Sequence, residues 1–241
     1  MHATAWQTAT RRRSLQDSSG SGLRDTFAIM PPALTLYAES SWMSPWVFHA
    51  MVALEEKQLA YKLEVVPLPI PKDVAAKLAT KAVLGKVPIL VHDDTWITES
   101  LAISEYLAES FPFPAHPRLF PEDLKERARA RQVMSWLRTS LAGLRTDRPT
   151  SNVFGRPTVH PLSERGRADA DELLRVATAL VTPGKPHMFA TWSIADADLA
   201  LALMRMIGSQ DNVPSYLVDY ALAQWDRRSI KRYVAHVPTT P

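Results

Sequence analysis

The pattern of apolar and polar residues changes once along the chain. Up to about residue 111, short alternating runs typical of strands are interleaved with runs of helical periodicity. From about residue 122 onward, only helical periodicity remains. The expected strands cover 34–37, 61–65, 89–91 and 95–98, the last two as a hairpin around 92–94, and the expected helices among them begin at Pro45 and cover 74–82 and 100–111. The predicted order of the first part is therefore β-α-β-α-β-β-α.

This order predicts an α/β domain over residues 31–113 that is thioredoxin-like in the succession of its elements. A proline-rich stretch follows, which cannot be helical and predicts a linker over 114–121. The rest of the chain predicts an all-α domain over 122–241. Its expected helices cover 122–146, 162–181, 194–209, 214–224 and 228–236.

Residues 1–30 differ from the rest, being rich in Ser, Thr and Arg, and predict a disordered N-terminal extension. An Arg-rich leader is also typical of a transit peptide, but Asp17 and Asp25 argue against that interpretation. The formal net charge is +3, and most of it lies before Met30. We therefore expect no nucleic-acid binding, apart from the remote option of the run Arg11-Arg12-Arg13.

Three absences in the sequence narrow the possible chemistry and location of the protein. The chain has no cysteine, which excludes disulfides, thiolate metal sites and a protein-borne redox pair. No two of the 7 histidines form a close ligand pair, so we predict no metal. No apolar run is long enough to span a bilayer, and we expect a soluble, cytoplasmic protein that binds no membrane.

The most informative motif is Val87-Pro88, followed eleven positions later by Glu99-Ser100. Because proline has no N–H for a ladder, a strand that begins on Pro88 leaves neighbouring backbone available to pair with an extended, peptide-like ligand. Glu99 and Ser100 lie where the next helix begins. The same two residue types are common as helix caps, so taken alone they favour a structural role.

Several separated features together resemble the cytosolic glutathione transferases, from about Ala33 to the C-terminus. They are Ser44-Pro45 at the start of the first helix, Lys86-Val87-Pro88, Glu99-Ser100, the proline-rich linker and Ser193-x-x-Asp196. Within that family the chain is most similar to the bacterial serine-type members. The resemblance implies the glutathione transferase architecture. The Ser193 and Asp196 pair is also explained fully as a helix capping box, and Asp198 is expected to accept hydrogen bonds near the same helix start.

The resemblance implies that glutathione is a co-substrate held by Lys86, Val87, Pro88, Glu99 and Ser100. The main chain of Val87 would pair with the cysteinyl part, next to a cis Pro88. Ser100, with the backbone N–H groups of the helix start, suits the γ-glutamyl carboxylate, and Glu99 suits the neighbouring ammonium. Lys86 is the candidate for the glycyl carboxylate, with Lys72 and Lys81 as rivals.

Ser44 is the candidate catalytic residue, because a hydroxyl that donates to sulfur favours the thiolate of glutathione. Ser before Pro is also an ideal helix N-cap, and the two roles are compatible. Ser41, Ser40 and Tyr37 remain alternatives. The absence of cysteine excludes the cysteine-type mechanism.

By resemblance, the protein is expected to be a homodimeric enzyme that conjugates glutathione to hydrophobic electrophiles or reduces organic hydroperoxides with it. The alternative is a binding or regulatory protein of the same fold with little catalysis. A second, hydrophobic substrate would lie between the domains against the helix from Glu122. Trp42, Met43, Met134 and Trp136 are candidates to line that site, although such residues more often belong to a core.

Overall fold

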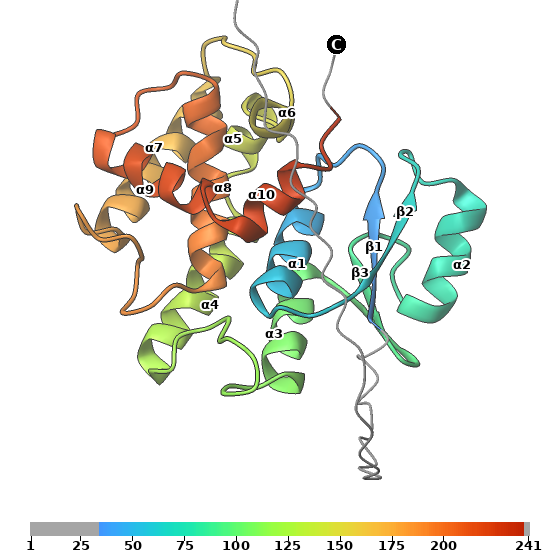
Figure 1. The fold of residues 1–241 in the computed structure, drawn as a ribbon. Helices are drawn as coiled ribbons and strands as arrows, with labels where there is room; N and C mark the ends of the chain where they lie inside the picture. Colours follow the sequence, from blue (N-terminus) through green and yellow to red (C-terminus); the bar gives the residue numbers. More distant parts are fainter. Residues whose placement is uncertain (1–33, 239–241) are drawn as a thin grey trace, which may run out of the picture. The chain divides into compact units, whose positions relative to one another are not determined.

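The computed structural model describes residues 34–238. Within this range a mixed α/β part precedes an all-helical part, as Figure 1 shows. The first part consists of β1 (Leu34–Glu39), α1 (Pro45–Glu56), β2 (Lys62–Val66), α2 (Lys72–Ala82), β3 (Ile89–His92), β4 (Thr95–Thr98) and α3 (Ser100–Ser110). The predicted element order and fold class are confirmed. The predicted disordered extension over 1–30 lies outside the described residues.

The four strands form one sheet in the order β2-β1-β3-β4. β1 and β2 are parallel, whereas β3 is antiparallel to both β1 and β4. The side chains of Leu34, Leu36 and Ala38 alternate toward one face, where they pack with apolar residues of α1 and α3. Tyr37 and Ile89 pack on the other face against α2. Figure 1 shows this arrangement, with α2 on the outer side of the sheet.

Helix α1 lies between the sheet and the helical part, which explains its composition. Its residues from Val47 to Leu54 are all buried, so it has no polar face. Its start is set by Pro45 at the first helical position and by Ser44 as N-cap. It contacts α3 on the sheet side, and α8 and α10 on the helical side. The segment that begins at Ser44 is therefore fixed on several sides.

The helical part is built around α8 (Ile194–Gly208), which is buried along nearly all of its length. The other helices of this part are α4 (Leu124–Thr139), α5 (Ala142–Asp147), α6 (Ser151–Phe154), α7 (Glu164–Leu180), α9 (Ser215–Trp225) and α10 (Arg228–Val234). None of the helices within residues 34–238 has the length and apolar character needed to cross a bilayer.

The expected single helix over 122–146 is wrong in detail, because α4 and α5 are separate helices. Ser140 closes α4 with an extended backbone, and Leu141 has φ of +60°. This left-handed conformation is unusual for leucine. The periodicity of apolar residues continues across the break, since Leu137, Leu141 and Leu144 all pack into one core cluster. That continuity is why the pattern gave no sign of the break, and the short α6 was also not expected.

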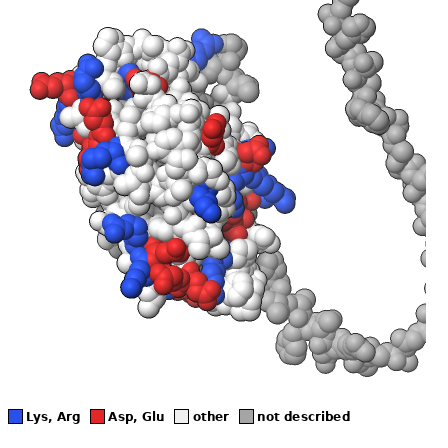
Figure 2. Space-filling view, turned by 90° about the vertical axis from the view of Figure 1, so that its left-hand side faces the viewer, with Lys and Arg blue, Asp and Glu red and all other residues white. Residues whose placement is uncertain are grey.

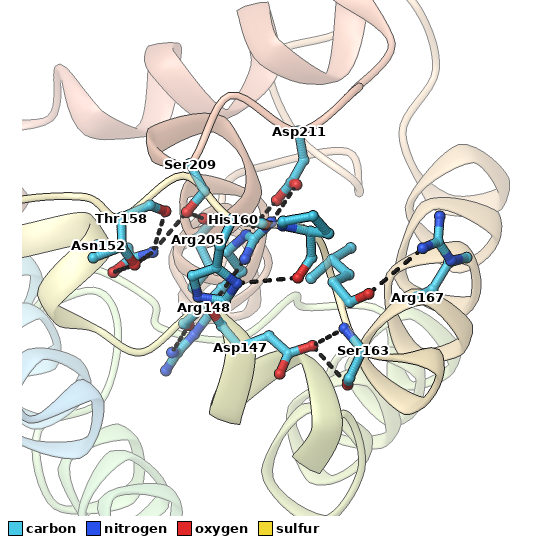
Figure 3. Close-up of polar contacts among 12 residues, drawn as sticks. Asp147, Arg148, Asn152, Thr158, His160, Ser163, Arg167, Arg205, Ser209 and Asp211 are labelled. Atoms are coloured by element: carbon cyan, nitrogen blue, oxygen red, sulfur yellow. Dashed lines mark hydrogen bonds and ion pairs between the residues drawn. The ribbon is translucent and has the colours of Figure 1, made fainter.

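A buried polar cluster holds the connection between α6 and α7, shown in Figure 3. Arg148 is only 1% exposed, and its guanidinium donates to both carboxylate oxygens of Asp211 at 2.8 and 2.7 Å. It also donates to the carbonyl of His160 at 2.8 Å, while Asn152 donates to Ser209 Oγ at 2.7 Å. Because these groups satisfy one another, we assign the cluster a structural role.

The charged side chains on the face seen in Figure 2 are mixed in sign. Lys and Arg lie interspersed with Asp and Glu, and no continuous basic stripe crosses this face. Among the described residues, several charged side chains form exposed ion pairs, such as Arg175 with Glu172 at 2.7 Å. On this face, therefore, the charges do not form the continuous basic patch that is typical of a nucleic-acid interface.

Candidate functional site

The strand register brings the sequence-predicted segments to one edge of the sheet. Tyr37 of β1 lies opposite Ile89 of β3, and Ile89 lies opposite Thr98 of β4. Because β3 runs antiparallel to both neighbours, its first residue lies at the same edge as the last residues of β1 and β4. The 40–44 loop, Val87-Pro88 and Glu99-Ser100 therefore extend from this single edge.

The Val87–Pro88 peptide bond is cis, as the resemblance implies. The ladder of β3 begins only at Ile89, so Val87 pairs with neither neighbouring strand. Gly85 is required just before, since a Cβ there would lie 2.5 Å from the carbonyl oxygen of Ala75 in α2. Lys86 is exposed at this edge and makes no ion pair with the described residues. Of its rivals, Lys81 lies over the ring of Trp96 at 4.9 Å.

Glu99 and Ser100 have opposite environments although they are adjacent. Glu99 is exposed and has φ of +67° and ψ of 112°. This backbone conformation is sterically unfavourable for every residue except glycine. Ser100 is the first residue of α3 and is only 3% exposed. Its Oγ accepts a hydrogen bond from Arg138 Nη2 of α4 at 3.2 Å. Because that bond occupies a lone pair, the hydroxyl proton of Ser100 remains available for an anion.

Arg138 belongs to a buried network that joins the two parts of the fold. Its Nη1 pairs with Asp198 Oδ2 of α8, and Asp198 Oδ1 lies 2.6 Å from His49 Nδ1 of α1. His49 Nε2 lies 2.8 Å from the hydroxyl of Ser104 in α3. Four helices thus meet through these side chains. The expectation that Asp198 accepts hydrogen bonds near the buried helix start is met by two partners, the Arg138 cation and the imidazole of His49.

Burial and the charges within this network shift the pKa values of His49 and Asp198. Burial lowers the pKa of His49 below its usual value, and the Arg138 cation lowers it further, while Asp198 opposes the shift. Burial would raise the pKa of Asp198, but Arg138 and His49 more than offset this, and the pKa of that carboxyl lies below its usual range. A neutral His49 then donates from Nδ1 to Asp198, and its Nε2 is an acceptor facing the Ser104 hydroxyl, which also donates to the carbonyl of Ser100 at 3.0 Å.

The four hydroxyl groups that are candidates for the thiolate donor differ in their contacts. Ser44 Oγ accepts from the backbone N–H of Val47 at 3.3 Å and donates to no group among residues 34–238. Ser41 Oγ instead donates to a carboxylate oxygen of Glu39 at 2.6 Å. Ser40 is exposed, and its Oγ accepts from Leu68 N at 3.3 Å. Tyr37 packs on the α2 side of the sheet, 5.5 Å from the ring of Trp96. Among the four, only Ser44 lies at the start of α1 and also has a hydroxyl proton that is not donated to another group among residues 34–238.

Glu39 organises this loop, and the sequence analysis did not identify it. The residue ends β1 and is 1% exposed, with a carboxylate that accepts from backbone N–H groups of the loop. From the opposite side, Tyr233 of α10 donates to the carbonyls of Trp42 at 3.0 Å and Ser44 at 3.1 Å. The only signal in the sequence is an acidic residue at the end of an apolar strand, which is equally typical of an exposed turn.

The four residues expected to line a second-substrate site differ in burial and position. Met134 is fully buried and Trp42 is 6% exposed, so both belong to the core. Trp136 packs into the cluster around α7 and α8. Met43 is half-buried next to Ser44. A small hollow of about 30 Å³ lies between the start of α1 and the helical part, where Pro45 and Trp46 face Leu137, Leu141, Leu144, Arg145, Asp198, Leu201, Ala202 and Arg205.

Comparisons with known proteins match both the α/β part and the helical part of the chain. Residues 43–110 match the model of the glutathione S-transferase N-terminal domain, and residues 123–238 match that of the C-terminal domain. A solved glutathione transferase homologue from Burkholderia gl BGR1 with bound glutathione is 31% identical and has a TM-score of 0.71. The match covers 85% of this chain and 98% of that one.

Curated relatives give shorter matches. Glutathione S-transferase T1 from Arabidopsis thaliana is 27% identical over 65% of this chain and 67% of the relative. Glutathione S-transferase U13 from the same plant is 35% identical, over 38% of this chain and only 39% of its own length. The match to this second relative spans 91 residues, so only part of its length is compared.

Proposed function

Because this chain belongs to the glutathione S-transferase family, we propose that it binds glutathione at the sheet edge and activates its thiol for attack on hydrophobic electrophiles or organic hydroperoxides. The observation that carries this proposal is the convergence of the 40–44 loop, Val87-Pro88 and Glu99-Ser100 on one edge. The finer placement, as a serine-type member that acts as a cytoplasmic homodimer, is part of the same proposal. Ser44 and the absence of cysteine support the serine-type assignment.

The binding roles follow from the chemistry of each group. Glutathione is an extended peptide, and the unpaired main chain of Val87 beyond the ladder provides hydrogen-bonding groups for its cysteinyl part. Ser100 offers its hydroxyl proton to the γ-glutamyl carboxylate, with the Arg138 cation behind it. The exposed carboxylate of Glu99 pairs with the ammonium of the same ligand residue. Lys86 is the charge available for the glycyl carboxylate.

Ser44 acts on the sulfur. A free thiol has a pKa of about 8.5. A hydrogen bond to a charged acceptor contributes about 1.5 to 3 kcal/mol, and about 1.4 kcal/mol corresponds to one pKa unit. Donation from Ser44 therefore lowers the thiol pKa by about one to two units, and the N-terminus of α1 adds to the effect. The proton leaves to solvent and the thiolate becomes the nucleophile.

Two reactions are open to this thiolate. With an electrophile, the carbon–sulfur bond forms while a leaving group departs with the electron pair, or while a conjugated double bond takes it up. With a hydroperoxide, the thiolate sulfur attacks the terminal oxygen, the oxygen–oxygen bond breaks, and the alkoxide leaves and takes a proton from solvent to become the alcohol. The resulting sulfenic acid is then reduced by a second glutathione, giving glutathione disulfide and water. Met43, which packs against the apolar core and is half-buried beside Ser44, offers apolar surface to a hydrophobic second substrate.

Calorimetric titration with glutathione tests the binding. We expect the wild-type protein to bind at millimolar concentration or below, and Ser100→Ala to weaken the affinity by about tenfold, because the variant loses a charge-assisted hydrogen bond. Ser40→Ala, an exposed serine on the same loop as Ser44, is the matched control and should bind like the wild type. Absence of heat from the wild-type protein at millimolar glutathione would contradict the proposed function.

A further inference from the structure

We propose that Glu39 and Tyr233 are positioning residues that clamp the 40–44 loop from its two sides and so set the place of the Ser44 hydroxyl. The inference rests on the proposed function of Ser44. Neither residue needs to touch glutathione for this role. Each acts on the main chain of the loop, Glu39 on its N–H groups and Tyr233 on its carbonyls.

The carboxylate of Glu39 accepts hydrogen bonds from the backbone N–H groups of residues 41 to 44. Oε2 accepts from the backbone N–H of Ser41 at 2.5 Å and of Trp42 at 3.0 Å. Oε1 accepts from Met43 N at 2.7 Å and from Ser44 N at 2.9 Å. Four consecutive N–H groups therefore point at one buried carboxylate. Such an arrangement fixes the backbone far more tightly than a helix cap with one or two donors.

The carboxylate also decides which serine is available. Ser41 donates its hydroxyl proton to Glu39 Oε2 at 2.6 Å. Since the negative charge makes this a strong hydrogen bond, the proton of Ser41 is not available to sulfur. The hydroxyl proton of Ser44 is not engaged in the same way. Glu39 thus selects Ser44 over Ser41 as the donor.

Tyr233 closes the other side of the loop from the last helix of the described chain. Its hydroxyl shares one proton between the carbonyls of Trp42 and Ser44. Its ring packs edge-on against Phe48 of α1 at 5.2 Å and against Trp42 at 5.6 Å. Burial, together with the Glu39 charge, raises the pKa of Tyr233 well above its usual value, so the phenol stays a donor. A residue 189 positions away thus holds Ser44.

The loop needs both partners because its conformation is unfavourable on its own. Trp42 has φ of +56°, which an aromatic residue rarely adopts. A displacement of about 1 Å at a reacting group lowers a rate by about a hundredfold. If the clamp is loosened, Ser44 moves relative to the sulfur, while the binding groups at Val87 and Ser100 lie on other segments. The expected signature is a loss of thiol activation with little loss of binding.

The test compares Glu39→Gln with wild type in three measurements on the full-length protein. Gln keeps the size of the side chain but turns an amide NH₂ toward the loop donors. We expect kcat to fall by about tenfold to a hundredfold, and the pH at which the rate rises to move upward by about one unit. The calorimetric Kd for glutathione should change by less than about twofold.

Glu56→Gln is the matched control, because Glu56 is also a largely buried carboxylate with several donors. It accepts from Arg227 at 2.8 and 2.7 Å and from Ser229 at 2.5 Å, at the opposite end of α1 from the 40–44 loop. We expect this variant to lose stability without moving the pH profile. A Glu56→Gln profile shifted like that of Glu39→Gln would assign the effect to general loss of structure and overturn the proposal.

Tyr233→Phe tests the contact of Tyr233 with the carbonyls of the 40–44 loop, and it replaces Glu39→Gln in the experiment if that variant does not fold. It removes one hydroxyl and should shift the pH profile in the same upward direction, by a smaller amount. A profile that is unchanged in both variants, or that moves to lower pH, would overturn the clamp, since the latter would mean that Glu39 acts only as an unfavourable charge. If wild type itself does not bind glutathione, the proposed function fails instead, so the two failures are distinguishable.

Discussion

Glu99 carries backbone strain at the candidate binding edge, while its neighbour Ser100 is the buried start of a helix. A non-glycine residue at φ of +67° and ψ of 112° costs about 1 to 3 kcal/mol, and such strain persists where the surrounding structure enforces it. The strain is explained if the carboxylate has to be presented at this point. A structural cap would need neither this conformation nor an exposed carboxylate.

Glu99→Gly is therefore predicted to separate stability from binding. Glycine adopts this backbone conformation without steric cost, so we expect the free energy of unfolding to rise by about 1 kcal/mol. The loss of the carboxylate should raise the Kd for glutathione by about tenfold. Urea unfolding and calorimetry measure the two effects.

Glu99→Gln is the control, because it keeps a side chain in the strained conformation and removes only the charge. It should weaken glutathione binding without any gain in stability. A Glu99→Gly variant that binds glutathione like the wild type would show that this carboxylate has no part in recognition.

Some residues of the site can be predicted from the sequence and others cannot, for a physical reason. Val87-Pro88 and Glu99-Ser100 are visible because proline and a helix start impose local constraints, and the cis bond at Pro88 is confirmed. Ser44 is visible as an N-cap, and its catalytic role stays a prediction. Glu39, Tyr233 and Arg138 act through contacts between distant segments, and only the folded backbone brings these together.

At the scale of elements, a helix start that carries a capping pattern is predicted correctly from the sequence. The start of α8 is fixed by Asp196, which accepts from the backbone N–H of Ser193 at 2.8 Å, as the capping pattern predicts. The same carboxylate also accepts from Met188 N and from the hydroxyl of Tyr220, each at 2.8 Å. Burial raises the pKa of Asp196 above its usual value. The cap is therefore also a tertiary link, which a local pattern does not reveal.

The division of one expected helix into α4 and α5 shows the opposite case. The apolar positions on both sides of Leu141 fill the same cluster, so burial continues although the backbone turns. Hydrophobic periodicity reports which side chains are buried and carries no information on a single left-handed residue. Fold class is robust to such errors, because it depends on the order of elements and not on their exact ends.

At the scale of the whole molecule, the buried network of His49, Asp198 and Arg138 joins α1 to α4 and α8. The pKa of His49 lies below the value of 6.5 that an unperturbed histidine has. At pH values between the lowered pKa of His49 in the folded protein and 6.5, this histidine binds more protons in the unfolded chain than in the folded one. The contribution of His49 to the free energy of unfolding therefore decreases as the pH falls below about 6.5.

We predict that this pH dependence is smaller in His49→Gln than in the wild type. Glutamine does not titrate, and its amide retains a donor for Asp198. Urea unfolding of both proteins at several pH values from about 7.5 down to about 5 gives the two slopes. His160→Gln, at an exposed position, should keep the wild-type slope. Equal slopes in the wild type and His49→Gln would contradict a neutral, buried His49.

The membership of the glutathione S-transferase family, predicted from separated motifs, is confirmed by matches to both domains. The thiol chemistry at Ser44 is the central claim of the proposed mechanism. It depends on one hydroxyl whose proton has no other acceptor within residues 34–238. The same loop holds Ser40, which is exposed and provides a close control.

The most direct test is the pKa of the glutathione thiol bound to wild type, Ser44→Ala and Ser40→Ala, followed by the ultraviolet absorbance of the thiolate as the pH is raised. We predict a pKa about one to two units below the free value of about 8.5 in wild type and Ser40→Ala. In Ser44→Ala it should return close to the free value while glutathione still binds. An equally lowered pKa in Ser44→Ala would contradict the assignment of Ser44 as the thiolate donor.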